Sequence, residues 1–349
     1  MSAEHDDPET HKNEGRWHLE LHPDVEKHAP RSALRFGSFI HPTHATLQAT
    51  DRDLQWTSRD HRKLRHLAAD PKTGRLRRGA GTLQKLANLR RVEYWNVGWW
   101  IAIASPPVFV YLFTAGSVVW VANGFIAFLP FVDAAVAQDG VGGGWTAWVG
   151  ATVFECGAVC GLWEAWNRGD AADFGWGVKR LLHGEPASEK HAAPPKRRWI
   201  WFSTDGKYFH ELGFLAAFVQ FWAATIFWIS GFTAIPTIQK AIMPRVGLWD
   251  GVFWTPQVVG GIGFMISSTL LMLETQRKWY LPALTSLGWH VGFWNLVGGT
   301  GFTLCGALGY ALNSSTKLAY QSACSTFWGG WAFLLGSLIQ WYEAVNPVA

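Results

Sequence analysis

Cysteine is scarce in this chain: its 349 residues include only four, which is too few to suggest a disulfide framework. The sequence also has no G-x-x-x-x-G-K-[ST] phosphate loop, no H-E-x-x-H helix, no G-x-S-x-G nucleophile turn and no set of four Cys. The first 91 residues lack a short apolar core behind a basic start, so no signal peptide is expected. We therefore expect a protein that is not an enzyme and that carries no cofactor.

Charge is also missing from long stretches after the first quarter of the chain, and apolar residues take its place. The composition is 49% hydrophobic, with 23 Trp and 37 Gly. Tryptophan is enriched where membrane proteins meet the lipid–water interfaces, and glycine lets helices approach closely within lipid. This composition predicts an integral membrane protein.

One apolar stretch recurs three times. From Trp145 to Trp163 the only charged residue is Glu155, and the stretch ends at Glu164; about 20 helical residues cross the hydrocarbon core of a bilayer. The same pattern ends at Glu274 and at Glu343. Counted back from each Glu, the shared positions are Gly150, Gly260 and Gly329 at −14, Phe154, Phe264 and Phe333 at −10, and the small residues Gly157, Ser267 and Gly336 at −7. The repetition predicts three copies of one unit.

The predicted fold is an all-α membrane domain over 96–346, with about six transmembrane helices in three repeated hairpins. The hairpins are 96–167, 211–276 and 286–346, and the loop 168–210 joins the first two. Pro106-Pro107 predicts a kink in the first helix, which we expect to end near Asn123. The segment 124–137 is then expected to lie at the far interface, as a shallow element.

The N-terminal tail is polar. Residues 1–81 contain nine His and show no persistent period, so we expect a largely disordered tail in which the histidines are solvated rather than bound to a metal. Residues 82–95 predict a basic amphipathic juxtamembrane helix with Thr82 as N-cap. The segment 59–91 holds 11 Lys and Arg against two Asp. It could contact anionic lipid or simply stop the first span; nucleic acid is not an expected partner, because this basic run abuts the membrane.

Charge also predicts the topology. The tail and the loop 168–210 are basic, whereas 131–144 has no Lys or Arg. The positive-inside rule therefore places both termini in the cytosol, in an endomembrane or the plasma membrane. A single N-x-[ST] sequon, at Asn313, falls in an expected far-side loop and is a candidate N-glycosylation site. Nothing in the sequence indicates an oligomeric state.

The three recurring acids Glu164, Glu274 and Glu343 fall at the cytosolic ends of their helices, where a carboxylate is unfavourable with its own helix dipole. They could form a ring of acids at a cytosolic mouth that attracts cations. Alternatively, each Glu caps and orients a neighbouring helix, which is the interpretation that a repeated packing unit favours. His210 and His290 precede two other helices and are interpreted as interfacial histidines rather than haem ligands.

Glu155 stands near the middle of its span and in one copy only. An ionisable group at this depth costs roughly 2.5 kcal/mol or more to insert, so it is a candidate functional residue by default. Cys156 and Cys160 lie one turn apart beside it and could complete a soft-metal site, although no His lies in the span and no metal is expected. The third interpretation is a carboxyl that is hydrogen-bonded to a neighbouring helix.

A resemblance accompanies these features. The stretch FWTPQVVGGIGFMISSTLLMLETQRKWYLPALTSLGWHVGFWNLVGGTGFTLCGALG resembles uncharacterised fungal integral membrane proteins. Hairpins with G-S or S-S steps before an apolar end are similar to the YrhK-like membrane domain. The resemblance covers roughly 95–346 and excludes the tail. It implies a fungal multi-pass protein, and no activity, cofactor or catalytic residue transfers with it.

Two classes of function follow. One is a transporter, channel or small-ligand-binding membrane protein with Glu155 as a midplane site. The other is a structural or scaffold protein that binds lipid or partner subunits through its Trp-rich surface. A polar pathway would favour the first class, and the predicted spans offer few residues for it: Glu155, Gln220, Gln257, Asn295 and Gln340.

Overall fold

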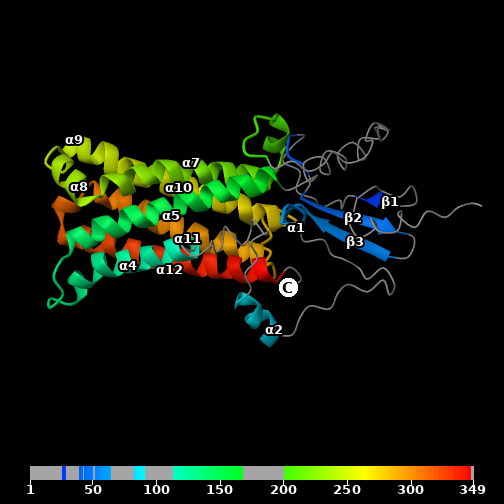
Figure 1. The fold of residues 1–349 in the computed structure, drawn as a ribbon, viewed down its shortest axis with the longest axis horizontal. Helices are drawn as coiled ribbons and strands as arrows, with labels where there is room; N and C mark the ends of the chain where they lie inside the picture. The colour runs from blue at the N-terminus through cyan, green and yellow to red at the C-terminus, as the bar shows by residue number, and fades with distance from the viewer. Residues whose placement is uncertain are drawn as a thin grey trace, which may run out of the picture.

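The computed structural model describes residues 26–28, 39–41, 43–49, 52–63, 82–90, 113–167 and 200–346. The main body is a bundle of long helices, and a small sheet and two short helices lie at one end of it (Figure 1). The long helices are α4 (Phe113–Val132), α5 (Gly140–Trp166), α7 (Leu212–Thr233), α10 (Thr255–Thr275), α11 (Leu287–Gly309) and α12 (Thr316–Val345).

These six helices form a closed ring. Each packs against the helix before and after it in sequence, and α12 packs against α4 to complete the circle. Neighbours alternate in direction, so α5, α10 and α12 end where α7 and α11 begin, at the end of the bundle that faces the sheet (Figure 1). We call this the α1 end, after the short helix α1 (Ser58–Arg62) that lies there, and the opposite one the far end.

Five described helical stretches are long and apolar enough to cross a membrane: α4, α5, α7, Val246–Thr275 and α11. The prediction of a multi-pass membrane protein with a helical membrane part is thereby confirmed. The stretch Val246–Thr275 joins α9 (Val246–Trp249), the π-helical turn η4 (Asp250–Trp254) and α10. The shorter α8 (Pro236–Ile242) precedes it at the far end.

Helical backbone is favoured here because lipid offers no hydrogen-bond partners to a peptide group. Hydroxyl side chains inside the spans follow the same rule and bond to carbonyls of their own helix, as Thr152 does to Trp148 at 2.8 Å. Glycine permits the closest helix contacts. A Cβ on Gly301 of α11 would lie 2.8 Å from the Cα of Gly329 in α12, so these two backbones can approach only without side chains.

The first described membrane helix differs from the prediction. We expected a helix end near Asn123 and a shallow segment after it, but α4 continues without a break to Val132 and contains Pro130. The reason is packing: a Cβ on Gly124 would lie 2.7 Å from the Cα of Phe327 in α12, so this glycine marks a helix contact and not a corner. The predicted start of the helix and its Pro106-Pro107 kink lie outside the described residues.

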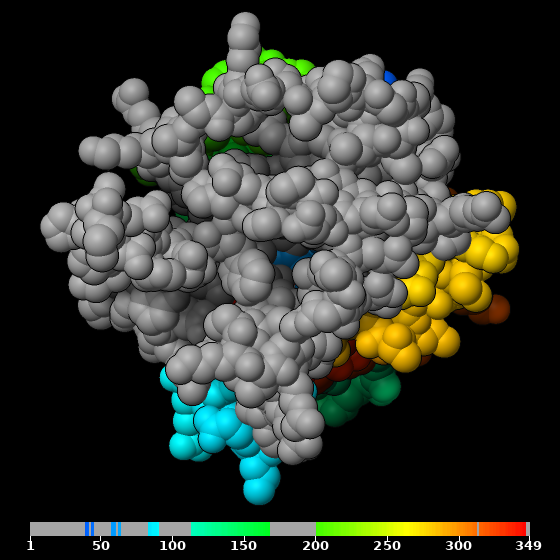
Figure 2. All heavy atoms as spheres, turned by 90° about the vertical axis from the view of Figure 1, so that its right-hand side faces the viewer, coloured from blue at the N-terminus to red at the C-terminus, as the bar shows by residue number. Residues whose placement is uncertain are grey.

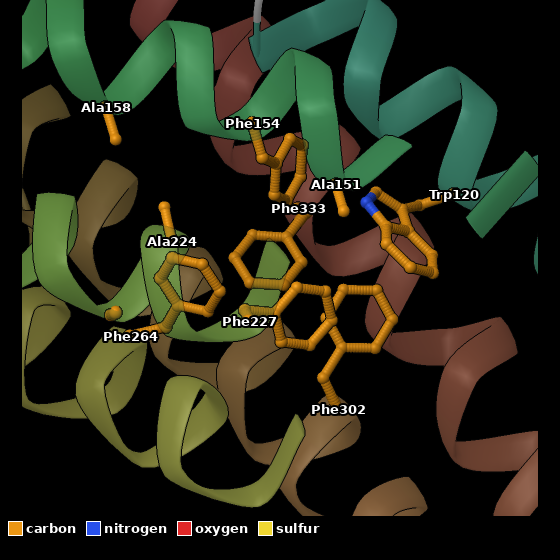
Figure 3. Packing of buried hydrophobic residues seen from close by; sticks show 10 residues of the cluster. Trp120, Ala151, Phe154, Ala158, Ala224, Phe227, Phe264, Phe302 and Phe333 are labelled. Carbon is orange, nitrogen blue, oxygen red and sulfur yellow. The ribbon is translucent and has the colours of Figure 1, made fainter. Parts of the chain in front are cut away.

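Aromatic rings fill the axis of the ring in two layers (Figure 3). Phe154, Phe264 and Phe333 form one layer, with ring centroids 5.3–6.4 Å apart. Trp120, Phe227 and Phe302, from α4, α7 and α11, form the other at 4.7–5.6 Å. Such tilted and edge-to-face pairs are favourable beyond the burial of their area. The three Phe residues that the sequence comparison aligned therefore meet on the axis.

The tail contributes order that the sequence analysis did not anticipate. Strands β1 (Glu26–His28), β2 (His44–Ala49) and β3 (Arg52–Thr57) form an antiparallel sheet in the order β1-β2-β3, with His44 paired to Thr57 at the bundle-side edge of the β2–β3 hairpin. Helix α1 (Ser58–Arg62) follows β3 directly. Helix α2 (Thr82–Ala87) continues into the 3-10 turn η2 (Asn88–Arg90). Most of 1–81 lies outside the described residues.

Candidate functional site

The three recurring acids gather at the α1 end of the ring. Glu164, Glu274 and Glu343 each lie in the last turn of α5, α10 and α12. Their helices run in the same direction and alternate with α7 and α11 around the ring. The three carboxylates gather around the same two side chains, because Arg59 contacts Glu343 and Glu274, and Arg62 contacts Glu274 and Glu164. All three residues are at most 6% exposed. We call this set the acid ring.

Two arginines of α1 bind two of these acids through paired bonds. Arg59 donates to Glu343 from Nε at 3.0 Å and from Nη2 at 2.7 Å. Arg62 donates to Glu274 from Nε at 3.3 Å and from Nη2 at 2.7 Å. The planar guanidinium matches a carboxylate in this two-pronged geometry, which is stronger and more specific than a single bond.

The third acid is held less firmly. The Nζ of Lys63 lies 3.5 Å from Oε1 of Glu164, and Nη1 of Arg62 lies 3.8 Å from Oε2. Oε1 of Glu164 is buried and accepts no hydrogen bond from the part of the chain that the structure describes. Glu164 is therefore the member of the acid ring whose carboxylate has the fewest short contacts.

The charges of the site balance: α1 and the residue after it bring three cations to three acids. Burial by itself would lower the pKa of Arg59, but the neighbouring carboxylates, Glu343 first, outweigh it and raise that pKa. The pKa of Arg62 is raised in the same way, chiefly by Glu274. The arginines thus remain charged, and they offset the unfavourable interaction between each carboxylate and the C-terminal end of its helix.

Local sequence fixes the position of α1. Thr57 and Asp60 bond each other at the start of the helix, where the Thr57 hydroxyl donates to Asp60 at 2.6 Å and accepts from its backbone N–H at 3.1 Å. The Ser58 N–H donates to the Thr43 carbonyl of the sheet at 2.8 Å, and its hydroxyl donates to Glu274 at 3.3 Å. On the bundle side, Gly288 lies in the first turn of α11 and leaves room for the Arg59 side chain.

Two further contacts dock the tail beside α1. The His41 Nδ1 lies 2.9 Å from Oε1 of Glu211, the residue before α7, and both side chains are buried. At the ring's other side, the Asn88 amide donates to Asn346 at 2.9 Å. In a view onto this end, blue atoms of the described tail show at the centre and α2 lies at the edge (Figure 2).

A cavity of about 60 Å³ lies beneath α1 on the axis of the ring. Its roof is Arg59, Arg62 and Lys63, and the Phe154, Phe264 and Phe333 layer closes its other side. Five polar side chains of the bundle also line it, namely Ser117, Gln220, Asn295, Ser337 and Gln340, together with the carboxylate of Glu164. Three residues that the sequence analysis counted as a sparse polar pathway, Gln220, Asn295 and Gln340, thus share one cavity wall.

Glu155 lies elsewhere. It does not line the cavity but sits at the seam between α5 and α7, where the Thr225 hydroxyl donates to its Oε1 at 2.9 Å. Its Oε2 is buried and has no hydrogen-bond partner within the described ranges. Cys156 beside it is exposed, and Cys160 is partly buried. Within the described parts of the chain, no three His, Cys, Asp or Glu side chains are grouped so that they could hold a metal.

The other candidate residues are also placed. Asn313 belongs to the short 3-10 helix η5 (Leu312–Ser314), between α11 and α12 at the far end; its side chain lies outside the described part. His210 bonds the Phe39 carbonyl through Nδ1 at 2.7 Å, and His290 bonds the Leu284 carbonyl through Nε2 at 2.8 Å. Both histidines therefore bond backbone carbonyls near the starts of α7 and α11.

Sequence reasoning missed the cations of the site. Arg59, Arg62 and Lys63 were counted as part of a basic stretch beside lipid, although three buried acids require three positive partners somewhere in the protein. It also missed an Asn three residues after two of the acids. Asn167 and Asn346 each bond the carbonyl four residues earlier, and each contacts a further segment, at Ile200 and at Lys85 respectively. The shared letters EAWN and EAVN were the available signal.

No family model matches this chain, and no curated protein and no solved structure matches it either.

Proposed function

We propose that this multi-pass membrane protein binds or transports a small cation, and that its site is the cavity beneath the acid ring rather than Glu155. In this proposal α12 is the sixth span, the hairpins are three copies of one unit, and the α1 end with both termini faces the cytosol. The role is binding or transport and not catalysis. The resemblance to YrhK-like fungal membrane proteins remains a hypothesis about origin and adds no activity.

The observation that carries the proposal is the polar wall of an axial cavity inside an otherwise apolar bundle. Amide and hydroxyl groups from Gln220, Asn295 and Ser337 converge on a space beside the Glu164 carboxylate. Polar groups within a membrane domain are expensive and mark ion or substrate sites when they share a cavity. A structural bundle needs no such group on its axis.

The lining favours a cation. Carboxylate, amide and hydroxyl oxygens are the donors that hard cations prefer, and the faces of Phe113, Phe154 and Phe333 add aromatic surface. A cavity of about 60 Å³ holds a few water-sized molecules. The site therefore suits a monovalent ion with part of its hydration shell, and it excludes larger organic solutes.

A second candidate, a structural or scaffold protein, is favoured by the two aromatic layers. Trp120, Phe227 and Phe302 close the axis beyond the Phe154 layer, so no open pathway follows the cavity in this structure (Figure 3). The exposed Trp201, Trp222 and Trp279 would then serve as lipid or partner contacts.

The test is sodium and rubidium uptake into vesicles that contain the purified protein, together with the shift in unfolding temperature that each ion produces. We expect ion-dependent stabilisation and uptake above that of empty vesicles. We expect Asn295→Leu and Gln340→Leu to lower uptake at least about tenfold. Glu155→Gln is the matched control because Glu155 is polar, lies in the membrane and is outside the cavity. If the folded protein shows neither ion-dependent stabilisation nor uptake, the cation proposal is wrong and the scaffold role remains.

A further inference from the structure

The acid ring is occupied in this structure by a segment that is not part of the membrane bundle. We propose that α1 with Lys63 is a tethered plug: it fills the cation site and closes it, and its withdrawal onto an anionic lipid surface opens the ring. This inference rests on the proposed cation-binding function and supplies its regulation.

The contact between α1 and the bundle is made by polar groups. The helix reads Ser58-Arg59-Asp60-His61-Arg62 and has no apolar residue. Its described bonds to the bundle come from the Ser58 hydroxyl and the two guanidinium groups. A contact held by charge can be exchanged for another partner of the same charge, whereas an apolar contact would need a new apolar surface.

On the bundle side, solution cations can take the place of the α1 cations at the acid ring. When α1 leaves, Glu164, Glu274 and Glu343 lose the cations that neutralise them, and a buried carboxylate without a partner is strongly unfavourable. Solution cations can replace the arginines, because Glu164 lines the polar cavity and the two arginines link it to Glu274 and Glu343. Entry is easiest beside Glu164: among the described residues its buried Oε1 has no hydrogen-bond partner, and the Lys63 Nζ lies 3.5 Å from it.

On the tail side, anionic lipid headgroups can take the place of the acid ring as partners of the α1 cations. Arg59, Arg62 and Lys63 begin a stretch, 59–91, that holds 11 Lys and Arg against two Asp. Such a stretch is attracted by an anionic leaflet, and the attraction grows with each added cation. The same three side chains cannot bind the acid ring and lipid headgroups at once. Anionic lipid and the acid ring therefore compete for α1.

The tail stays close when α1 withdraws. His41 contacts Glu211 on one side and Asn88 contacts Asn346 on the other, and neither contact uses an acid of the ring. These two attachments restrict the plug to the neighbourhood of the site. A tethered ligand of this kind acts at a high effective concentration, so moderate changes in its attraction to lipid shift its occupancy.

The experiment compares two triple variants of the full chain in vesicles. One carries Arg59→Gln, Arg62→Gln and Lys63→Gln. The matched control carries Lys240→Gln, Arg245→Gln and Lys317→Gln, which removes the same charge at the far end. Two quantities are measured: amide hydrogen exchange over residues 57–63, and rubidium uptake. A third sample is the unchanged protein in phosphatidylcholine vesicles with or without phosphatidylserine. Because this sample carries no substitution, a folding defect cannot affect it.

We expect the α1 variant to exchange at least about tenfold faster over 57–63 than the control and to take up rubidium faster by a similar factor. Phosphatidylserine should likewise raise hydrogen exchange over 57–63 and rubidium uptake in the protein without substitutions. If exchange over 57–63 rises in the α1 variant, while its rubidium uptake equals that of a far-end control variant that transports rubidium, the plug inference is wrong and the proposed function survives. If exchange rises, no sample takes up rubidium, and rubidium does not shift the unfolding temperature of the unchanged protein, the proposed function fails. Unchanged exchange in the α1 variant and with phosphatidylserine would show that charge does not hold the plug.

Discussion

At the scale of single residues, the paired Arg–Glu contacts are the most constrained feature of the molecule. Arg62 and Glu274 are 6% and 1% exposed and share two hydrogen bonds. Desolvation of two such charges is expensive, and their mutual attraction repays it only while both are present. The pair therefore specifies where the tail docks more than it adds net stability.

A double-substitution cycle tests this. Arg62→Met or Glu274→Met alone should destabilise the protein by about 3–5 kcal/mol, because each leaves a buried charge without its main partner. The double variant should lose much less than the sum of the two. The measurement is the free energy of unfolding in detergent. Lys207→Met is the control: its partner Asp205 is 3.4 Å away and both are exposed, so we expect a change within about 1 kcal/mol. Strict additivity of the two single losses would contradict the coupling.

Glu155 gives a second prediction at this scale. Since it bonds Thr225 at the α5–α7 seam and does not face the cavity, Glu155→Gln should leave ion uptake unchanged. Thr225→Val should lower the unfolding temperature, because it removes a donor to a partly buried carboxyl. If ion uptake is lost in Glu155→Gln but retained in Thr225→Val, Glu155 is part of the ion site and the prediction is wrong.

The acids of the site could be found from the sequence, whereas their partners could not. Glu164, Glu274 and Glu343 share spacing with Phe154, Phe264 and Phe333, and a shared period reports a shared environment. Arg59 meets Glu343 across 284 positions of chain. No local pattern encodes a contact of that separation, and a lone Arg in a polar segment has the same local appearance whether it is solvated or buried.

At the scale of elements, the helix contacts depend on positions without side chains. Gly301→Leu should destabilise the protein by at least about 2 kcal/mol, because the new side chain would meet the backbone of α12 and the core cannot absorb it. Gly161→Ala in α5 is the control: an added Cβ there meets nothing within 4 Å, and helix propensity should make it neutral or slightly stabilising. Thermal unfolding of both variants measures the difference, and equal losses would contradict the packing argument.

The docking of the tail should depend on pH through His44 of β2. Burial first, and then the charge of Arg277, lowers the pKa of His44, while Glu274 and Asp60 partly offset this. A depressed pKa means that the docked tail binds a proton less readily than the free tail. Docking is therefore favoured above the ordinary histidine pKa of about 6.5 and weakens as the pH falls below it.

Hydrogen exchange over 43–63, normalised to the intrinsic rate at each pH, measures this effect. Exchange should rise between about pH 7.5 and about pH 5.5 in the unchanged protein. His44→Gln should show a smaller rise. His41, which contacts Glu211, is present in both proteins, so its contribution cancels in the comparison. An identical rise in the two proteins would contradict the assignment to His44.

Two errors of the sequence analysis belong to this scale. The Gly124-Phe125 step was interpreted as a corner because glycine ends helices in water, but in α4 the same glycine admits the backbone of α12. The strands β2 and β3 were missed because the tail is rich in His and polar residues. A local signal was nevertheless present: the segments HATLQA and RDLQWT alternate polar and apolar residues, and the pairing sets Ala45 opposite Trp56 and Leu47 opposite Leu54.

At the scale of the whole molecule, the alternating helices separate two ends with different chemistry. The acid ring, α1 and the C-terminus lie at one end, and η5 with Asn313 lies at the other. If the α1 end faces the cytosol, Asn313 faces the compartment in which glycans are attached. Expression in a eukaryotic host should yield a glycosylated form, and both Asn313→Gln and glycosidase treatment should abolish its slower migration in gels. A glycan attached instead at an acceptor site introduced beside α2 would invert this orientation.

The closed ring also sets an order on biosynthesis. Arg59 is made before any of the six helices, whereas its partner Glu343 lies two residues before the end of α12, the last of them. The contact therefore cannot exist until α12 has been made and has inserted between α11 and α4. A chain that stops short of α12 carries Arg59 without its acid and a ring without its closing helix. The contact between a cation made before the bundle and an acid made in its last helix thus forms only when all six helices are present.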